Sequence, residues 1–466
     1  MKYHAFAVFW WLPWLIIAVA LAGVALLIVL AVRTRQRLWK IASLVSAVVV
    51  LACSCGGFGV ASLYQGSPAN ASAPVPDTLS LAFVQHAPGV TSETTSLASL
   101  NARTGAVRWQ HTFDGSSRYP VADMFSAADE HTIYFEADQL QTIVAVGASD
   151  GQERWRTPLS NSLVPQSPIR FIAPPVVSDG MVFISASASA SAAYSENPPG
   201  VLVFALHADT GALAWSLPIK GINANEQAQL LTARQGVLFV ELPTGNLVAL
   251  RGSDGTQLWS APDSTSGGNP SVVTDGVVSF LQYQHIVALD APTGKLLWSY
   301  PVDDQVTTAF RNPLGIGASS VYVSSNRFIN NTAVQYLISL NAQTGNVQWT
   351  YQTNFESTGA SVTEAGNLVY YAHGSYLDAM RTSNGQRVWR YSAAPNLGFG
   401  TPVVVDGVLY VSSNIGSSHT IVMCFGDCPP STAIYALNAS TGAVYWRYAS
   451  EAIDTSVPPW VTNSAN

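Results

Sequence analysis

Hydrophobic positions follow two different patterns along the chain. Residues 5–32 form an apolar run without a charged side chain, and residues 41–64 form a second run. About 20 apolar residues span the hydrocarbon core of a bilayer, so either run is long enough to cross a membrane. Beyond residue 64, apolar residues fall into short groups separated by Gly, Pro, Asn and Asp, which is typical of short strands joined by turns. The chain therefore divides into an N-terminal membrane segment and a β-rich body.

The N-terminal segment, residues 1–64, is predicted to be a transmembrane helical hairpin. Its two spans, 5–32 and 41–64, are joined by residues 33–40, which contain three Arg and one Lys. Short basic loops stay in the cytoplasm, so both ends of the hairpin are expected outside. An alternative is a lipoprotein signal in which Cys53 carries the lipid. Either arrangement places the remaining chain on the extracytoplasmic side of the cell membrane.

The β-rich body follows a short linker. Residues 65–77 are rich in Pro, Ser and Ala and lack periodicity, as extended linkers do. Residues 78–462 are assigned to the body, and residues 463–466 are assigned to a tail.

Eight copies of one motif occupy the body. Every copy places Gly four residues before Trp, and Ala or Ser six residues before that Gly. Self-similarity of this kind indicates a repeat architecture. The eight motif pairs are Gly105 and Trp109, Gly151 and Trp155, Gly211 and Trp215, Gly255 and Trp259, Gly294 and Trp298, Gly345 and Trp349, Gly385 and Trp389, and Gly442 and Trp446.

Each motif position has a physical reason. The residue before Gly is Thr, Asp or Asn, and these residues favour turns because their side chains bond to the nearby backbone. Gly adopts positive φ at little steric cost, as a tight hairpin requires. The indole ring of Trp provides a large, flat apolar surface that can pack against a neighbouring sheet. We therefore interpret the eight tryptophans as structural residues.

A second kind of hairpin precedes several copies. Residues 173–185, 269–281 and 401–413 each place Asp-Gly between β-branched runs, which is a strong hairpin signal. Two hairpins give four strands, A to D, in about 40–50 residues, and this is one propeller blade. The sequence thus predicts an all-β, eight-bladed β-propeller of four-stranded antiparallel blades. Residues 455–462 match the strand-A pattern and are predicted to close the ring as the innermost strand of blade 1.

The motif resembles the repeat of the PQQ-like (pyrroloquinoline-quinone-like) β-propeller family, with its Ala-Leu-Asx-Ala-x-Thr-Gly-x-x-x-Trp core. This family includes quinoprotein alcohol dehydrogenases and the propeller lipoprotein of the outer-membrane assembly machinery. The resemblance covers residues 78–461 and implies the propeller fold. Its dehydrogenases hold PQQ with calcium, an aspartate base and a disulfide between adjacent cysteines. This sequence has no adjacent cysteine pair, so we expect no cofactor.

The charge distribution excludes nucleic acid as a partner. Residues 1–64 carry five basic and no acidic side chains, whereas residues 65–466 carry 28 acidic and 16 basic ones. A body this acidic does not gain affinity from phosphate contacts.

Few residues could carry chemistry. No two His residues have metal-ligand spacing such as His-x-x-x-His, and no nucleophile elbow or phosphate-binding loop occurs. The sequence therefore predicts no metal site and identifies no catalytic or cofactor-binding residue. Cys424 and Cys428 lie in an insertion and are predicted to form a local disulfide in an oxidising compartment.

The candidate binding surface is the face that carries the long connections. The A–B and C–D turns are short and lie on one face, the short-turn face; the B–C and D–A connections vary in length and lie on the other, the long-loop face. Binding usually resides in long loops on a rigid scaffold. The linker enters blade 1 at strand B, so the short-turn face is expected to look toward the membrane. The candidate residues of the long-loop face are Tyr194, Asp303, Arg311, Asn312, Asn326, Arg327 and Phe399.

These patterns predict a membrane-anchored, extracytoplasmic binding or scaffold module for a protein, peptide or glycan partner. The alternative is a PQQ-dependent quinoprotein dehydrogenase that binds PQQ and calcium. The two differ in whether quinone co-purifies and whether alcohols reduce a dye.

Overall fold

The computed structural model describes residues 72–86, 95–113, 126–137, 142–159, 169–171, 174–188, 201–219, 229–242, 246–262, 272–274, 276–282, 285–301, 314–329, 332–354, 360–392, 397–415, 432–450 and 459–463. The chain divides into a unit of residues 1–67 and a unit of residues 68–466, and all the described residues belong to the second. The predicted helical hairpin, Cys53, and the Cys424–Cys428 pair lie outside the described residues. The described part of the chain contains no apolar helix of bilayer-spanning length.

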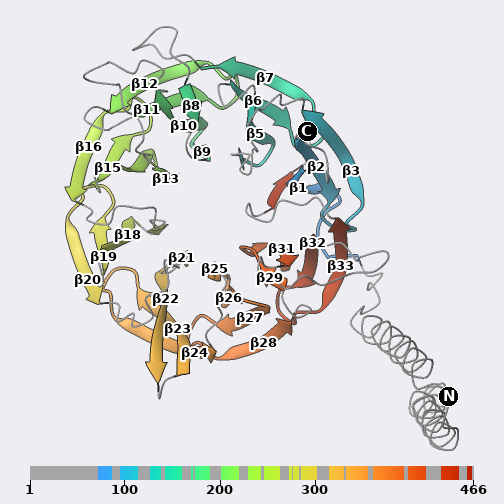
Figure 1. Cartoon of the computed structure of the whole chain (residues 1–466), viewed down its shortest axis with the longest axis vertical. Helices are drawn as coiled ribbons and strands as arrows, with labels where there is room; N and C mark the ends of the chain where they lie inside the picture. The colour runs from blue at the N-terminus through green and yellow to red at the C-terminus, as the bar shows by residue number, and fades with distance from the viewer. Residues whose placement is uncertain are drawn as a thin grey trace, which may run out of the picture. The chain divides into compact units, whose positions relative to one another are not determined.

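The second unit is a ring of eight antiparallel blades, as predicted (Figure 1). Blade 1 contains β34 (Trp460–Asn463), β1 (Leu79–His86), β2 (Thr95–Asn101) and β3 (Val107–Phe113). Blade 2 contains β4 (Ser126–Ala128), β5 (Thr132–Ala137), β6 (Thr142–Gly147) and β7 (Glu153–Pro158). Blade 3 contains β8 (Ile169–Phe171), β9 (Val176–Ser178), β10 (Met181–Ala188), β11 (Val201–His207) and β12 (Leu213–Ile219). Blade 4 contains β13 (Gln229–Arg234), β14 (Val237–Glu241), β15 (Asn246–Arg251) and β16 (Gln257–Pro262).

The other half of the ring repeats this order. Blade 5 contains β17 (Val272–Thr274), β18 (Val277–Gln282), β19 (His285–Asp290) and β20 (Leu296–Pro301). Blade 6 contains β21 (Leu314–Ile316), β22 (Ser320–Ile329), β23 (Thr332–Asn341) and β24 (Val347–Asn354). Blade 7 contains β25 (Ala360–Ala365), β26 (Leu368–His373), β27 (Tyr376–Arg381) and β28 (Arg387–Ser392). Blade 8 contains β29 (Leu397–Phe399), β30 (Val403–Val405), β31 (Val408–Ile415), β32 (Thr432–Asn438) and β33 (Val444–Ser450).

The ring closes inside blade 1. The C-terminal strand β34 pairs antiparallel with β1, in a register that sets Leu79 opposite Asn463 and Ala82 opposite Trp460. The sheet order β3-β2-β1-β34 makes β34 the innermost strand. The predicted closure is therefore confirmed for residues 460–462, whereas residues 455–458 lie outside the described residues and Asn463, assigned to the tail, is part of the strand. The pairing covers the edge of β1 that would otherwise be free to template aggregation.

A repeated bond joins each blade to the next, and we call it the inter-blade indole bond. The Nε1 of every motif Trp donates to a backbone carbonyl of the following blade over 2.6–3.0 Å, and the last bond returns from blade 8 to blade 1. The donor and acceptor residues are Trp109 and Ala148, Trp155 and Ala208, Trp215 and Gly252, Trp259 and Ala291, Trp298 and Ala342, Trp349 and Thr382, Trp389 and Ala439, and Trp446 and Ala102.

Two separate constraints require Gly at the motif position. All eight motif glycines have φ between 67° and 73°, a conformation that side chains other than Gly disfavour. A Cβ on any of them would also lie only 2.5–2.9 Å from the indole of the preceding blade. The tight turn and the packing of the tryptophan therefore depend on the same residue.

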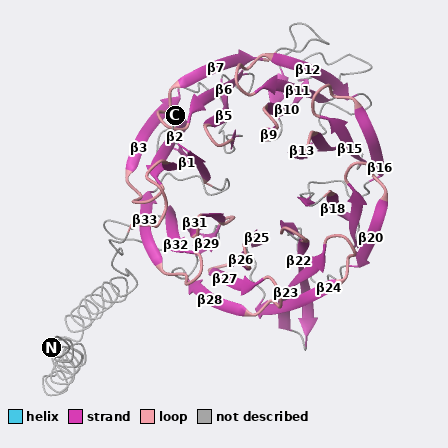
Figure 2. Ribbon diagram, turned by 180° about the vertical axis from the view of Figure 1, so that it is seen from behind, coloured by secondary structure: helices cyan, strands magenta, loops and turns pink. Residues whose placement is uncertain are grey.

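Aromatic packing differs among the blades. Opposite the small motif residue of strand C, six blades place a Tyr or Phe whose ring centroid lies 5.8–6.1 Å from the motif Trp of the same blade. Blades 1 and 5 have Ala82 and Ser279 at this position. Blades 6 and 7 are further joined by a parallel bridge between Ile316 of β21 and Thr363 of β25. The long β22–β23 hairpin of blade 6 extends beyond the outline of the ring (Figure 2).

Candidate functional site

The structure describes only part of the predicted long-loop face. Tyr194, Asp303, Arg311 and Asn312 lie outside the described residues. The described backbone of β22 includes Asn326 and Arg327, which form part of its pairing with β23.

Phe399 is described in full and lies inside the molecule. Its side chain in β29 is 8% exposed, and its ring centroid lies 6.0 Å from that of Tyr391 and 6.3 Å from that of Tyr435. Its backbone N–H donates to the carbonyl of Gly374 over 3.3 Å. Phe399 therefore packs between blades 7 and 8, which differs from the surface position expected for it.

A charged cluster that the sequence interpretation missed lies inside blade 7. The carboxylate of Asp378 on β27 is fully buried and accepts two bonds from Arg390, from Nε over 2.6 Å and from Nη2 over 2.7 Å. Its Oδ2 also lies 3.0 Å from Nε2 of His373, which is fully buried as well. The hydroxyl of Tyr351 on β24 donates to the same oxygen over 2.9 Å. The cluster thus links three strands of blade 7 to the outer strand of blade 6.

Strand register explains why these side chains meet. Asp378 stands directly opposite Arg390 on β28, and His373 stands at the end of β26 opposite Tyr376. Asp378 occupies the position immediately before the small motif residue of strand C. The other seven blades place an apolar residue there: Ala98, Val144, Phe204, Val248, Val287, Ile338 and Tyr435.

The partners of Asp378 keep it ionised. Burial alone would raise the pKa of Asp378, but hydrogen bonds from Arg390 and His373, together with their charges, hold that pKa well below its usual range. The bonds to Asp378 raise the pKa of Arg390, which stays protonated. Burial and the nearby carboxylate raise the pKa of Tyr351. The cluster is therefore a carboxylate and guanidinium pair to which Tyr351 and His373 also donate hydrogen bonds.

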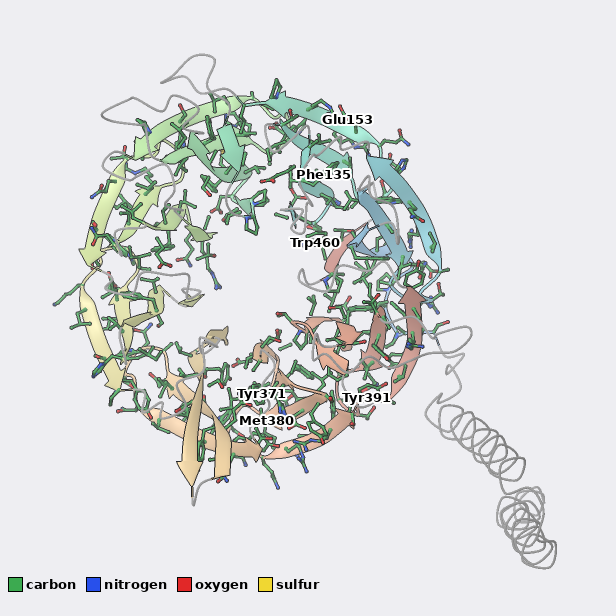
Figure 3. All side chains as sticks on the ribbon, in the orientation of Figure 1. Phe135, Glu153, Tyr371, Met380, Tyr391 and Trp460 are labelled. Atoms are coloured by element: carbon green, nitrogen blue, oxygen red, sulfur yellow. The ribbon has the colours of Figure 1, made fainter. Side chains whose placement is uncertain are left out.

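One bond of His373 is assigned by this pairing. An ionised Asp378 accepts only, so Nε2 of His373 donates to it. Nδ1 is buried and has no hydrogen-bond partner among the described residues, and the ring of Tyr371 stacks on the imidazole with 4.6 Å between the ring centroids. Tyr371 is labelled inside blade 7 in Figure 3.

A carboxylate that orients an imidazole is an arrangement used by general bases and by metal ligands. Here both groups are fully buried, so no substrate reaches Nδ1 in this conformation. The chemistry that the cluster performs as described is cross-linking of blades 6 and 7 and positioning of Arg390, which is partly exposed at 29%.

An open pocket of about 460 Å³ lies between blades 3 and 4 on the short-turn face. Met181, Phe183 and Val237 contribute apolar lining, and Asp179 and Arg251 contribute charged groups. The carboxylate of Asp179 accepts a bond from the backbone N–H of Gly236 over 2.9 Å and so joins the A–B turns of the two blades. The pocket combines apolar and charged walls, as small amphipathic ligands require.

No three His, Cys, Asp or Glu side chains within the described ranges converge where they could hold a cation. Asp378 has its oxygen atoms committed to Arg390, His373 and Tyr351.

Comparison with known proteins identifies the family to which the repeat belongs. A family model described as outer membrane protein assembly factor BamB matches residues 93–272, 262–430 and 384–463. The chain is 24% identical to outer membrane protein assembly factor BamB of Yersinia pestis over 315 residues, which cover 65% of this chain and 75% of that protein.

Two enzymes show a similar degree of likeness. The chain is 28% identical over 245 residues to the tetrathionate hydrolase of Acidithiobacillus ferrooxidans, covering 45% of this chain and 46% of the enzyme. It is 25% identical over 263 residues to the polyvinylalcohol dehydrogenase of Sphingopyxis sp., covering 50% of this chain and 37% of the enzyme. The chain thus spans less than half the length of either enzyme.

Proposed function

We propose that this chain, which belongs to the outer membrane protein assembly factor BamB family of PQQ-like repeat propellers, is a membrane-anchored scaffold that binds a protein partner outside the cytoplasm. The observation that carries the proposal is the family match, which extends over residues 93–463 and so includes all eight motif tryptophans. Relatives named as assembly factors favour a protein as the partner over a peptide or glycan.

The ring geometry supports a scaffold role. Eight inter-blade indole bonds form a closed circle, and β34 closes the remaining edge of blade 1. A closed ring resists opening because every blade is held from both sides. Long connections that start and end on one face of such a ring can hold a partner at fixed spacing.

The membrane anchor is proposed from the sequence. The apolar runs 5–32 and 41–64 are joined by a basic loop, which favours a hairpin with the propeller on the extracytoplasmic side. A lipid on Cys53 remains the alternative anchor. The disulfide between Cys424 and Cys428 fits the same compartment.

Photo-crosslinking of the full chain in native membranes tests the proposal. A benzophenone amino acid is introduced at Tyr194 or Asp303 on the long-loop face, and at Thr344 in the C–D turn of blade 6 as the matched control. We expect the long-loop sites to yield a discrete crosslinked protein and Thr344 to yield none. Crosslinks confined to Thr344, or none at any site, would contradict a partner on the long-loop face.

The second candidate is a PQQ-dependent dehydrogenase, favoured by the likeness to polyvinylalcohol dehydrogenase. Purified chain is mixed with PQQ and calcium and assayed for alcohol-dependent dye reduction. A retained quinone absorbance band together with turnover would replace the scaffold function by the enzymatic one.

A further inference from the structure

Three blades carry an arginine directly after the motif Trp. Across the eight blades this position holds Gln110, Arg156, Ser216, Ser260, Ser299, Thr350, Arg390 and Arg447. Arg156 pairs with Glu153 of its own strand over 3.0 Å, and Arg390 donates to Asp378. Arg447 of blade 8 is exposed, and no carboxylate among the described residues pairs with it. It is therefore the one arginine of this set whose partner must be sought elsewhere.

Arg447 has the same place in blade 8 as Arg390 has in blade 7. The strand register sets Arg447 directly opposite Tyr435, just as it sets Arg390 opposite Asp378. The ring of Tyr435 is 6% exposed, and the guanidinium of Arg447 lies over it, 5.6 Å from the ring centroid. A guanidinium that rests on an aromatic face keeps the N–H groups of its own plane free for an acceptor.

The preceding blade adds a tyrosine at both junctions. Tyr351, two residues after the motif Trp of blade 6, donates to Asp378. Tyr391 has this place in blade 7, where it is labelled in Figure 3, and its ring centroid lies 5.8 Å from that of Tyr435. Burial raises the pKa of Tyr391 to about 12, although the nearby charge of Arg447 opposes the rise, so its hydroxyl stays a donor. The two junctions thus share their donors, and only one has a described carboxylate between them.

We propose that Arg447 and Tyr391 form a docking site for a carboxylate, the side chain of an Asp or Glu on the protein partner. This inference rests on the proposed function, which supplies that partner. The chain itself shows what such a pair of donors holds, since Arg390 and Tyr351 hold the carboxylate of Asp378. Arginine binds a carboxylate through two parallel N–H bonds. Because Arg447 is exposed, the carboxylate can come from a second protein.

A carboxylate supplied by the chain tests the donors without any partner. Tyr435→Asp and Tyr435→Asn remove the same ring, and only the first places a carboxylate opposite Arg447. We expect Tyr435→Asp to melt at a higher temperature than Tyr435→Asn at pH 7, and we expect the difference to vanish when each is combined with Arg447→Gln. Equal melting temperatures, or a difference that survives Arg447→Gln, would overturn the site.

A small probe tests the site with Tyr435 in place. The full chain is prepared with isotope-labelled arginine, and the Nε–H signals of Arg447 and Arg156 are assigned by their loss in Arg447→Lys and Arg156→Lys. The probe is acetyl-glutamate amide, and the uncharged control is acetyl-glutamine amide. We expect a saturable shift of the Arg447 signal with the glutamate probe alone, and little shift of Arg156, which already pairs with Glu153. Equal responses of the two arginines, or to the two probes, would refute carboxylate binding.

Photo-crosslinking connects the site to the partner. In the full chain that carries the benzophenone amino acid at Asp303, Arg447→Gln is expected to reduce the crosslinked product by more than half. Arg156→Gln makes the same change at the same repeat position of blade 2 and is expected to alter the product little. A parent chain without any crosslink refutes the proposed partner, while the probe titration still decides whether the site holds a carboxylate. A crosslink that Arg447→Gln leaves unchanged overturns the docking contact alone.

Discussion

Blades 5 and 7 differ at one position of the repeat, where blade 5 has an apolar side chain and blade 7 has a charged one. Val287 of blade 5 precedes the small motif residue and packs among Phe239, Leu247 and Val278. Asp378 occupies this position in blade 7 and is bonded by Arg390, His373 and Tyr351. In blade 7 the buried carboxylate is present together with the side chains that donate hydrogen bonds to it. These donors are needed because a buried carboxylate without a partner destabilises the fold.

The largest effect is expected from removing the carboxylate. Asp378→Ala leaves Arg390 and His373 without their acceptor, and breaking such a buried pair costs about 3–5 kcal/mol. Val287→Ala, the matched change in blade 5, is expected to cost about 2 kcal/mol because it only opens a small cavity. Chemical denaturation of the purified chain measures both free energies of unfolding. A smaller loss for Asp378→Ala than for Val287→Ala would contradict the role given to the cluster.

The next effect distinguishes the two requirements for glycine. Gly385 has φ +69° and a Cβ there would lie 2.5 Å from the indole of Trp349, whereas Gly366 has φ +61° and open space around it. Gly366→Ala is expected to cost about 1–2 kcal/mol for its backbone conformation. Gly385→Ala adds overpacking of about 1–3 kcal/mol. Thermal unfolding of the two variants compares them, and equal shifts would show that contact with the indole adds nothing.

A smaller effect is expected when blade 7 is given the residues of blade 5. The triple variant Asp378→Val, Arg390→Ser and His373→Gln installs the residues found at Val287, Ser299 and Gln282. The variant removes both charges of the pair together, so neither is left buried without its partner, and the loss is expected to stay below that of Asp378→Ala. If the triple variant is as unstable as Asp378→Ala, the blades are not interchangeable at this position.

The smallest effect concerns acid. The folded pKa of Asp378 lies well below its unfolded value of about 4, because Arg390 and His373 outweigh the effect of burial. The stability it contributes is therefore present above about pH 4 and is lost as the pH falls below that value. The melting temperature of the triple variant should fall less between pH 5 and pH 3 than that of the parent. Parallel curves would contradict this assignment.

The repeat made most of the fold predictable. The Gly-to-Trp spacing located all eight outer hairpins, and the Pro-rich C-terminal pattern located the closing strand β34. Both are local signals. The parallel bridge between Ile316 and Thr363 could not be predicted, because it depends on how two inner strands meet across a junction.

The candidate site was less predictable. Asp378 could have been noticed, because its segment reads Leu-Asp-Ala-Met where blade 4 reads Leu-Val-Ala-Leu. Nothing in the sequence connects it to Tyr351, which comes from another blade. Phe399 was expected at the surface because it follows a long connection, yet it packs against Tyr391 and Tyr435.

The pairing of β1 has a mechanical consequence. β1 is the first strand after the linker, and it is hydrogen-bonded on one side to β2 and on the other to β34. A pulling force on the linker therefore acts on a strand that is hydrogen-bonded along both edges. The hydrogen bonds of both edges must break before the strand can leave the blade. Blade 1 is thus built to withstand tension applied through the linker, and the C-terminal strand contributes four paired positions beside the seven that β2 contributes.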